Sequence, residues 1–164
     1  MLARRAAGED LAAFAALVRA NEASLRRYLR RLSGDESDDL AQEALLAAWR
    51  SIGQWRADGS FAGWLRRIGT RRFLDRQRRA GPKQFAELDP QMAAPADAAD
   101  ERLAVNQALS ALPPRERAAA VLVYAEGHSH QEAAQILGLP LGTLKSIVAR
   151  ARVTLARKLE GIER

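Results

Sequence analysis

The stretch "SHQEAAQILGLPLGTLKSIVARAR", residues 129–152, predicts two helices joined by a very short turn. Ser129 and Glu132 have the spacing of a capping box, in which each side chain accepts a hydrogen bond from the backbone N–H of the other residue. Gly138 suits the left-handed position that follows a helix end. Pro140 cannot continue the first helix, but it can stand at the start of the next one. The two helices must therefore cross steeply.

The second helix of this pair has an apolar side and a polar side. Ala134 is small enough to let the two backbones meet, and Leu139 can fill the corner between them. The apolar side recurs every three or four residues, at Leu144, Val148, Ala151 and Leu155. Hydroxyl and basic residues lie on the polar side or flank it, namely Thr143, Lys145, Ser146, Arg150 and Arg152. This pattern favours a helix-turn-helix whose second helix enters the major groove of DNA. A plain helical hairpin within a bundle is the alternative interpretation.

The composition of the whole chain points to an all-α fold. The 164 residues are rich in strong helix formers, and no stretch alternates apolar and polar residues as a strand would. The chain has no cysteine, which excludes disulfides and thiolate metal sites and suits the cytoplasm. Acidic residues interrupt the apolar N-terminal stretch, so we expect an amphipathic helix there rather than a secretion signal. No apolar run is long enough to insert into a membrane.

A second basic feature is the run "RRIGTRRFLDRQRR", residues 66–79, in which Asp75 is the only acidic residue. Clustered arginines repel one another unless an anion lies nearby, and nucleic acid is the natural polyanion. A solvated or protein-facing helix surface is the alternative. Five arginines of this run are candidate DNA contacts: Arg71, Arg72, Arg76, Arg78 and Arg79. At helical spacing, Asp75 can pair with Arg71 or Arg79.

The chain divides into two small helical domains joined by a flexible linker. The segment 81–100 contains three prolines and no helical periodicity, so we interpret it as that linker between domains 1–80 and 101–164. Apolar spacing predicts further helices before the opening pair, over 10–32, 37–51, 61–79, 101–112 and 115–127. The first of these helices could break near Asn21.

The order of these motifs is similar to that of bacterial RNA polymerase sigma factors of the sigma-70 family, in particular the extracytoplasmic-function (ECF) group. The opening pair, with its lead-in L-x-x-L-P-x-x-x-R at 109–117, resembles region 4 of that family. In the first half, "DDLAQEALLAAW" matches the D-x-x-Q-E pattern of region 2 at Asp39, Gln42 and Glu43. "FAGWLRRIGTRRFLDRQRR" matches the F-x-x-W-L-x-x-I…D-x-x-R-R pattern of the same region.

The resemblance implies a promoter-specificity subunit that needs no cofactor or metal, is not an enzyme, and serves a stress or envelope response. Its implied partners are core RNA polymerase (the β′ clamp helices and the β flap), promoter DNA and an anti-sigma factor. Asp39, Gln42 and Glu43 would contact the clamp helices. The helix-turn-helix would read the minus-35 element, and the arginine-rich helix would lie beside the minus-10 element.

The loop "QWRADGSF" would capture a base flipped out of the promoter, with Trp55 and Arg56 supplying stacking and positive charge. Equally, Trp55 could pack into the helical bundle. Without polymerase, we expect the second domain or an inhibitory protein to cover the arginine-rich surface, because exposed arginines bind any DNA.

Three residues depart from the family pattern. Arg71 stands where the family usually has Asn, which bears on how the minus-10 element is read. Ile147 stands where an Arg is usual, so we expect the recognition helix to lack one base or phosphate contact. Ala133 replaces a larger aliphatic residue.

Other functions leave more of the chain unexplained. A free-standing helix-turn-helix repressor or activator would account only for residues 101–164. A nuclease using the acidic cluster around Asp38 and Asp39 is supported by charge alone, and these two residues also complement the dipole of their own helix. His128 and His130 have no third metal ligand in the sequence pattern.

Overall fold

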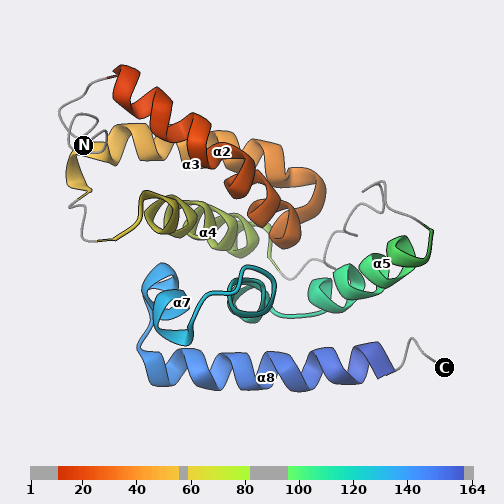
Figure 1. Ribbon diagram of the computed structural model, residues 1–164. Coiled ribbons are helices and arrows are strands. Elements are labelled where there is room, and N and C mark those ends of the chain that lie inside the picture. The colour runs from red at the N-terminus through yellow and green to blue at the C-terminus, as the bar shows by residue number, and fades with distance from the viewer. Residues whose placement is uncertain (1–10, 56–58, 82–95, 161–164) are drawn as a thin grey trace.

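The computed structural model describes residues 11–55, 59–81 and 96–160, and all regular elements in these ranges are helical (Figure 1). The first half contains α2 (Leu11–Ser33), α3 (Ser37–Ser51) and α4 (Phe61–Ala80), with short 3-10 turns at Gly34–Glu36 and Ile52–Gln54. The second half contains α5 (Ala96–Ser110), α6 (Pro114–Ala120), a π-helical turn (Val121–Ala125), α7 (His130–Leu137) and α8 (Leu141–Glu160). The predicted all-α fold of two helical parts is confirmed.

Most helix bounds follow the apolar spacing, but α5 does not. It begins at Ala96, whereas the sequence pattern predicted a linker up to residue 100. The stretch after Pro95 is rich in alanine, the best helix former. The expected break near Asn21 does not occur, since α2 continues from Leu11 to Ser33; the side chain of Asn21 donates to the Leu17 carbonyl.

The core of the first half is built on long side chains from all three of its helices. Tyr28 and Leu29 of α2 and Phe73 of α4 are fully buried. Gly69 lets α4 approach α2 closely, since a Cβ at this position would lie 3.2 Å from Leu29 Cδ2. Thr70 donates its hydroxyl hydrogen to the Arg66 carbonyl and lies 2.6 Å from the Tyr28 hydroxyl, which therefore donates to it. Burial raises the pKa of Tyr28 above its usual value.

The second half has a core of smaller side chains, as the alanine-rich composition predicts. Fully or nearly fully buried residues come from α6 to α8, including Ala118, Ala119, Leu122, Ala133, Ala134, Leu144 and Ala151. Small residues let helix axes approach closely, so this half is thin. In the described ranges, no helix combines the length and the apolar character that crossing a bilayer requires.

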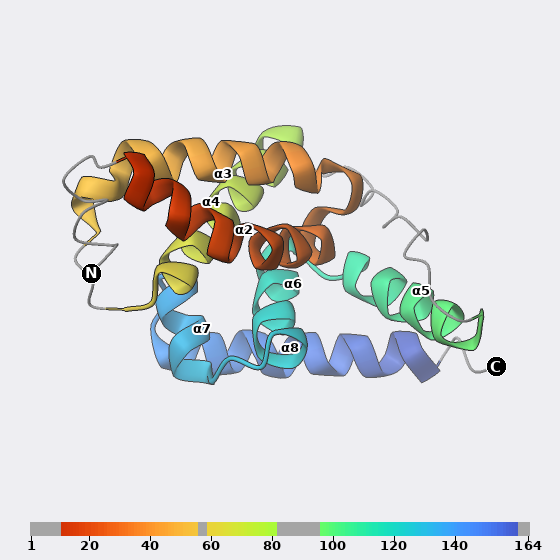
Figure 2. The same ribbon diagram turned by 45° about the horizontal axis from the view of Figure 1, so that its top comes forward.

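The two halves pack against one another. Helix α4 contacts α6 and α7, and α2 contacts α5 and α6. Figure 1 shows α4 lying over α7, and Figure 2 shows α6 running between α2 and α8. One continuous cluster of buried residues passes through both halves. The fold therefore presents the helix-turn-helix and the arginine-rich helix on one closed body.

Candidate nucleic-acid interface

The helix-turn-helix has the local geometry that its sequence predicts. The backbone N–H of Ser129 donates to Glu132 Oε2 at 2.8 Å, and the N–H of Glu132 donates to Ser129 Oγ at 3.2 Å. These contacts from Ser129 hold the pKa of Glu132 below its usual range. Gly138 ends α7 with φ 64°, and the N–H of Leu139 donates to the Ala134 carbonyl at 2.9 Å. The capping box and the left-handed turn are both confirmed.

Helix α8 separates its apolar and polar sides as the spacing predicts. Leu144, Val148 and Ala151 are at most 4% exposed. The five predicted DNA-contacting residues are all exposed: Thr143, Lys145, Ser146, Arg150 and Arg152. Ile147 is 5% exposed and belongs to the core. A buried isoleucine cannot reach DNA, so the expectation that the recognition helix lacks a contact at position 147 stays a prediction.

Two of the exposed residues on α8 already have partners within the chain. Ser146 Oγ donates to the Gly142 carbonyl at 3.1 Å. Arg150 Nε donates to Glu116 Oε1 at 3.1 Å, and the Glu116 side chain is 15% exposed against 62% for Arg150. Glu116 on α6 therefore orients the Arg150 guanidinium while leaving most of its surface open to a ligand.

The arginine-rich part of α4 remains uncovered by the second half. Ser60 caps this helix by accepting from the Gly63 N–H at 3.0 Å. Of the five candidate DNA contacts in this run, Arg71, Arg72, Arg78 and Arg79 are exposed. We expected either the second half or an inhibitory protein to cover this surface, and the second half leaves these four arginines exposed.

Two residues of the run, Asp75 and Arg76, form ion pairs within the first half that the sequence did not predict. Asp75 pairs with Arg78 at 3.3 Å rather than with Arg71 or Arg79. Arg76 is half-buried and donates to Glu43 of α3 and, at 3.4 Å, to Glu36. The structure thus brings a predicted DNA-contacting residue, Arg76, against a predicted polymerase-contacting one, Glu43.

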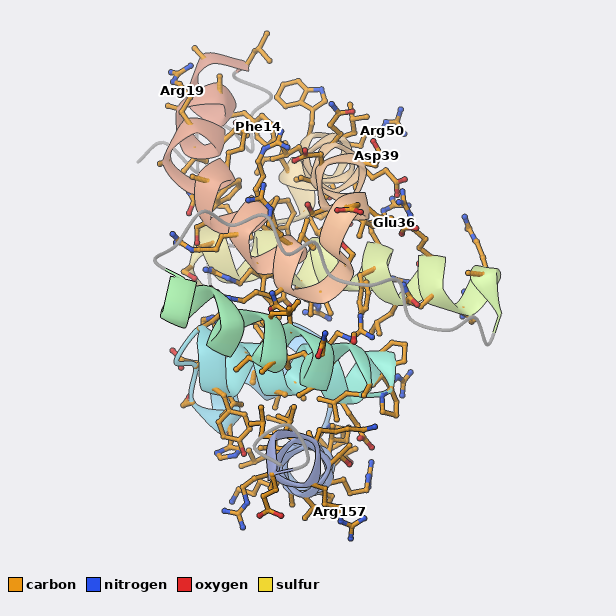
Figure 3. All side chains as sticks on the ribbon, turned by 90° about the vertical axis from the view of Figure 1, so that its right-hand side faces the viewer. Phe14, Arg19, Glu36, Asp39, Arg50 and Arg157 are labelled. Carbon is orange, nitrogen blue, oxygen red and sulfur yellow. The ribbon has the colours of Figure 1, made fainter. Side chains whose placement is uncertain are left out.

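The outer face of α3 combines acidic, amide and apolar side chains. Asp39, Gln42 and Glu43 are exposed along it, and Leu46 follows at helical spacing with 57% of its surface exposed. Figure 3 labels Asp39 and Arg50 on this side of the molecule. Asp38 turns toward α2 and accepts from Arg26 at 2.7 Å. Sequence spacing did not single out Leu46, although an exposed leucine beside this acidic motif is a visible signal.

Trp55, in the loop before α4, packs against the aromatic core of the first half, as one of the two interpretations expected. Its ring packs edge-on against Phe61, with centroids 5.8 Å apart, and lies 6.3 Å from the ring of Trp64. It also lines a cavity of about 530 Å³. Residues of both halves form this cavity: Trp55, Ser60, Trp64 and Arg67 from the first, and His128, Glu132, Gln135 and Ile136 from the second. Arg56 lies outside the described residues.

A charged contact between the halves was not predicted from the sequence. Glu126, which comes directly after the π-helical turn, accepts from Arg31 of α2 and, at 2.9 Å, from Arg66 of α4. Its side chain is 7% exposed. Arg66 belongs to the basic run that suggested DNA binding, yet its own side chain is 11% exposed. No periodicity rule marks these residues, because the pairing depends on how the halves dock.

The motif L-x-x-L-P-x-x-x-R ends in a buried cation. Arg117 is 2% exposed and donates to the carbonyls of Leu32 and Ser110, both at 2.7 Å. Its guanidinium also lies 5.9 Å from the ring centroid of Phe73. Burial lowers the pKa of Arg117 to about 10, so the group is still charged at neutral pH. Arg117 therefore makes a polar contact between the second half and the end of α2.

The described residues contain no group of side chains arranged to hold a metal ion.

Comparison with known proteins assigns each half to a part of one family. The family model "Sigma-70 region 2" matches residues 17–82, and "Sigma-70, region 4" matches residues 102–155. Among curated relatives, the ECF RNA polymerase sigma factor SigM of Mycobacterium tuberculosis is 39% identical over 97% of this chain and 83% of its own length. The ECF sigma factor SigW of Bacillus subtilis is 29% identical over 93% of this chain and 92% of its own.

Solved structures agree with these sequence matches. CnrH, in complex with the cytosolic domain of CnrY, superposes with a TM-score of 0.73 at 29% identity, covering 98% of this chain and 96% of CnrH. RpoE of Bartonella quintana, in complex with the anti-sigma factor NepR, gives a TM-score of 0.72 at 28% identity, covering 87% of this chain and 94% of RpoE. With 39% identity over nearly its whole length to an ECF sigma factor, the chain belongs to the extracytoplasmic-function group of the sigma-70 family.

Proposed function

We propose that this chain is a promoter-specificity subunit that brings core RNA polymerase to a particular set of promoters in the cytoplasm. One observation carries the proposal: region 2 and region 4 occur in order on one chain, and each presents an exposed surface suited to a separate task. The protein acts by binding and by helping to open the duplex, and it catalyses no reaction itself. We propose that it serves a stress or envelope response.

The polar side of α8 is proposed to read the minus-35 element. Residues at the N-terminal end of a recognition helix lie nearest the base edges, which places Thr143, Lys145 and Ser146 there. Arg150 and Arg152 lie further along the helix and suit phosphate oxygens. Base contacts discriminate between sequences, whereas phosphate contacts fix register and add affinity for any DNA.

The exposed arginines of α4 and the Trp55 cavity are proposed to serve the minus-10 element. Arg71, Arg72, Arg78 and Arg79 are all exposed, so their charge is open to a phosphate backbone. The wall of Trp55 and Trp64 offers aromatic surface for a base taken out of the stack. Arg76 fits this role less well, because Glu43 and Glu36 already neutralise it.

The outer face of α3 is proposed to bind core polymerase through the β′ clamp helices. Asp39, Gln42 and Glu43 supply carboxylate and amide groups for charge-assisted hydrogen bonds. Leu46 adds an apolar group that would lose its contact with water on binding. The second half would reach the β flap. Since RpoE of Bartonella quintana is solved with an anti-sigma factor, we propose an inhibitory protein of that kind for this chain as well.

The experiment that separates this function from its rival is a binding assay with purified core polymerase in the absence of DNA. A sigma factor forms a complex with core polymerase under these conditions. A free-standing helix-turn-helix repressor does not need to, because its only essential partner is DNA. The variant carrying both Asp39→Ala and Glu43→Ala should bind core polymerase more weakly while keeping its helical spectrum.

A further inference from the structure

Arg76, near the end of α4, holds two carboxylates of a neighbouring segment at once. Its Nη2 donates to Oε1 of Glu43 on α3, and its Nη1 donates to Glu36 Oε2 at 3.4 Å. The Arg76 side chain is 28% exposed, against 78% for Arg78 two residues further along the same helix. Packing of α3 against α4 brings these groups together. Arg76 therefore lies with the acidic groups beside α3 and apart from the exposed arginines of α4.

The carboxylates that Arg76 contacts belong to one stripe on the outer face of α3. Glu36 lies directly before α3, and Asp39, Glu43 and Leu46 follow at spacings of three or four, which places them on one side of the helix. All four side chains are exposed. The helix dipole stabilises carboxylates only near the first turn, so it favours Glu36 and Asp39 but not Glu43. Arg76 supplies the positive charge that Glu43 would otherwise lack.

The ion pair fixes the Glu43 carboxylate and still leaves it able to bind. An ionised carboxylate has two oxygens with about four acceptor sites in total, and the guanidinium engages Oε1. The Glu43 side chain is 46% exposed, so a donor on another protein can reach it. A side chain that is already held in one rotamer loses less conformational entropy when a partner binds. The bridge from Arg76 therefore prepares Glu43 for a partner that donates hydrogen bonds.

Neither stability nor DNA binding explains this bridge as well. Partly exposed ion pairs contribute little to the stability of a fold, because water screens them and two long side chains must be ordered. A phosphate group that approached Arg76 would also approach Glu36 and Glu43, and like charges repel. Arg71, Arg72 and Arg79 have no such acidic neighbours among the ion pairs of the described residues.

We propose that Arg76 is a positioning residue of the outer face of α3, where it holds the Glu43 carboxylate ready for core polymerase, and that it does not bind DNA itself. This inference rests on the proposed function, because core polymerase is the partner. It assigns Arg76 to polymerase binding and not to the minus-10 element. Glu36 gains a role as well, since it is the second carboxylate that fixes the guanidinium.

The test is a double-mutant cycle on the affinity of the full-length chain for purified core polymerase. Binding is measured without DNA and at high salt, where attraction between distant charges is screened. Arg76→Gln should raise Kd about two- to tenfold, as expected when one long side chain must be ordered during binding. In the Glu43→Ala background Arg76→Gln should have no further effect, because the group that Arg76 positions is gone. Arg76→Lys should recover most of the affinity, since an ammonium group can still donate to Glu43.

Arg26→Gln is the matched control for this cycle. Arg26 is 31% exposed and also donates to two carboxylates, those of Glu22 and of Asp38 at the start of α3. Its variant loses the same charge and the same kind of bridge, but away from Glu43, so core binding should not change. The melting temperatures of both variants should stay close to that of the parent. The positioning role is overturned if Arg76→Gln binds core polymerase as tightly as the parent or more tightly, if it loses as much affinity in the absence of Glu43, or if Arg26→Gln loses as much.

Binding of the free chain to random-sequence duplex DNA tests the second part of the proposal. The double variant Arg76→Gln, Glu43→Ala keeps the net charge of the chain, so a change in its salt dependence reports a lost contact. Its slope of log K against log salt should match that of the parent, whereas Arg72→Gln should reduce the slope by about one unit. A reduction of about one unit in the double variant would return Arg76 to the DNA-binding surface and overturn the proposal.

The affinity of the unaltered chain distinguishes failure of this inference from failure of the proposed function. If the parent binds core polymerase and Arg76→Gln binds it equally well, only the positioning role is wrong. If the parent does not bind core polymerase, the proposed function is wrong and the positioning role is overturned with it.

Discussion

Replacing Leu46 with alanine should weaken binding to core polymerase without weakening the fold. Leu46 is 57% exposed on the face of α3 that carries Asp39, Gln42 and Glu43. Complete burial of a leucine side chain is worth about 1.5–3 kcal/mol, so covering the exposed part could contribute roughly 1–1.5 kcal/mol to binding. Alanine retains a fraction of that area, which leaves an expected loss of about 1 kcal/mol, or roughly fivefold in Kd.

The assay is a titration of labelled full-length chain with core polymerase at constant salt. Alanine is a better helix former than leucine, so the melting temperature of the Leu46→Ala variant should not be lower than that of the parent. Leu11→Ala is the matched control, because Leu11 is 67% exposed but lies at the start of α2. The reasoning fails if Leu46→Ala binds core polymerase as tightly as the parent, or if Leu11→Ala loses as much affinity.

Three further predictions concern DNA binding and the folds of the two halves. Arg150→Ala should lower affinity for duplex DNA and reduce the slope of log K against log salt by about one unit, since one phosphate contact is lost; an unchanged slope would remove Arg150 from the interface. Tyr28→Phe should lower the free energy of unfolding by about 1 kcal/mol in urea titrations, because Thr70 loses its buried partner; equal stability would show that this bond contributes nothing. The pKa of Glu132 is lowered in the folded protein, so its capping contribution to stability is present above its unfolded pKa and is lost as pH falls through its folded pKa. Glu132→Gln should remove this part of the decrease in helicity at acid pH. A helicity profile against pH that does not change in the variant would contradict the assignment.

Features decided by neighbouring residues in the chain were predictable. The capping box at Ser129 and the left-handed Gly138 depend only on residue type and spacing, and the structure has both. The inward and outward sides of α8 follow from its periodicity, so the exposure of Lys145 and Arg152 was also predictable. The start of α5 was missed because aspartate and alanine together were interpreted as a linker, although both are favourable at a helix start.

Features decided by docking were not predictable from spacing. Arg66 lies on the side of α4 that faces the second half and is therefore buried, whereas Arg71 is exposed. Arg76 turns to Glu43 because α3 and α4 pack side by side, which no pattern within either helix records. The aim of Glu126 depends on a π-helical turn for which the stretch "VLVYA" carries no known signature.

Mapping of transcription start sites tests the assignment as a specificity subunit most directly. Purified chain and core polymerase are incubated with fragmented genomic DNA, and the 5′ ends of the products are compared with those made by core polymerase alone. The account predicts new starts that share one pair of sequence elements upstream, and these starts should disappear with the Asp39→Ala, Glu43→Ala double variant. The account would be contradicted if the chain bound specific duplex sites by itself but the transcription starts did not differ from those of core polymerase alone.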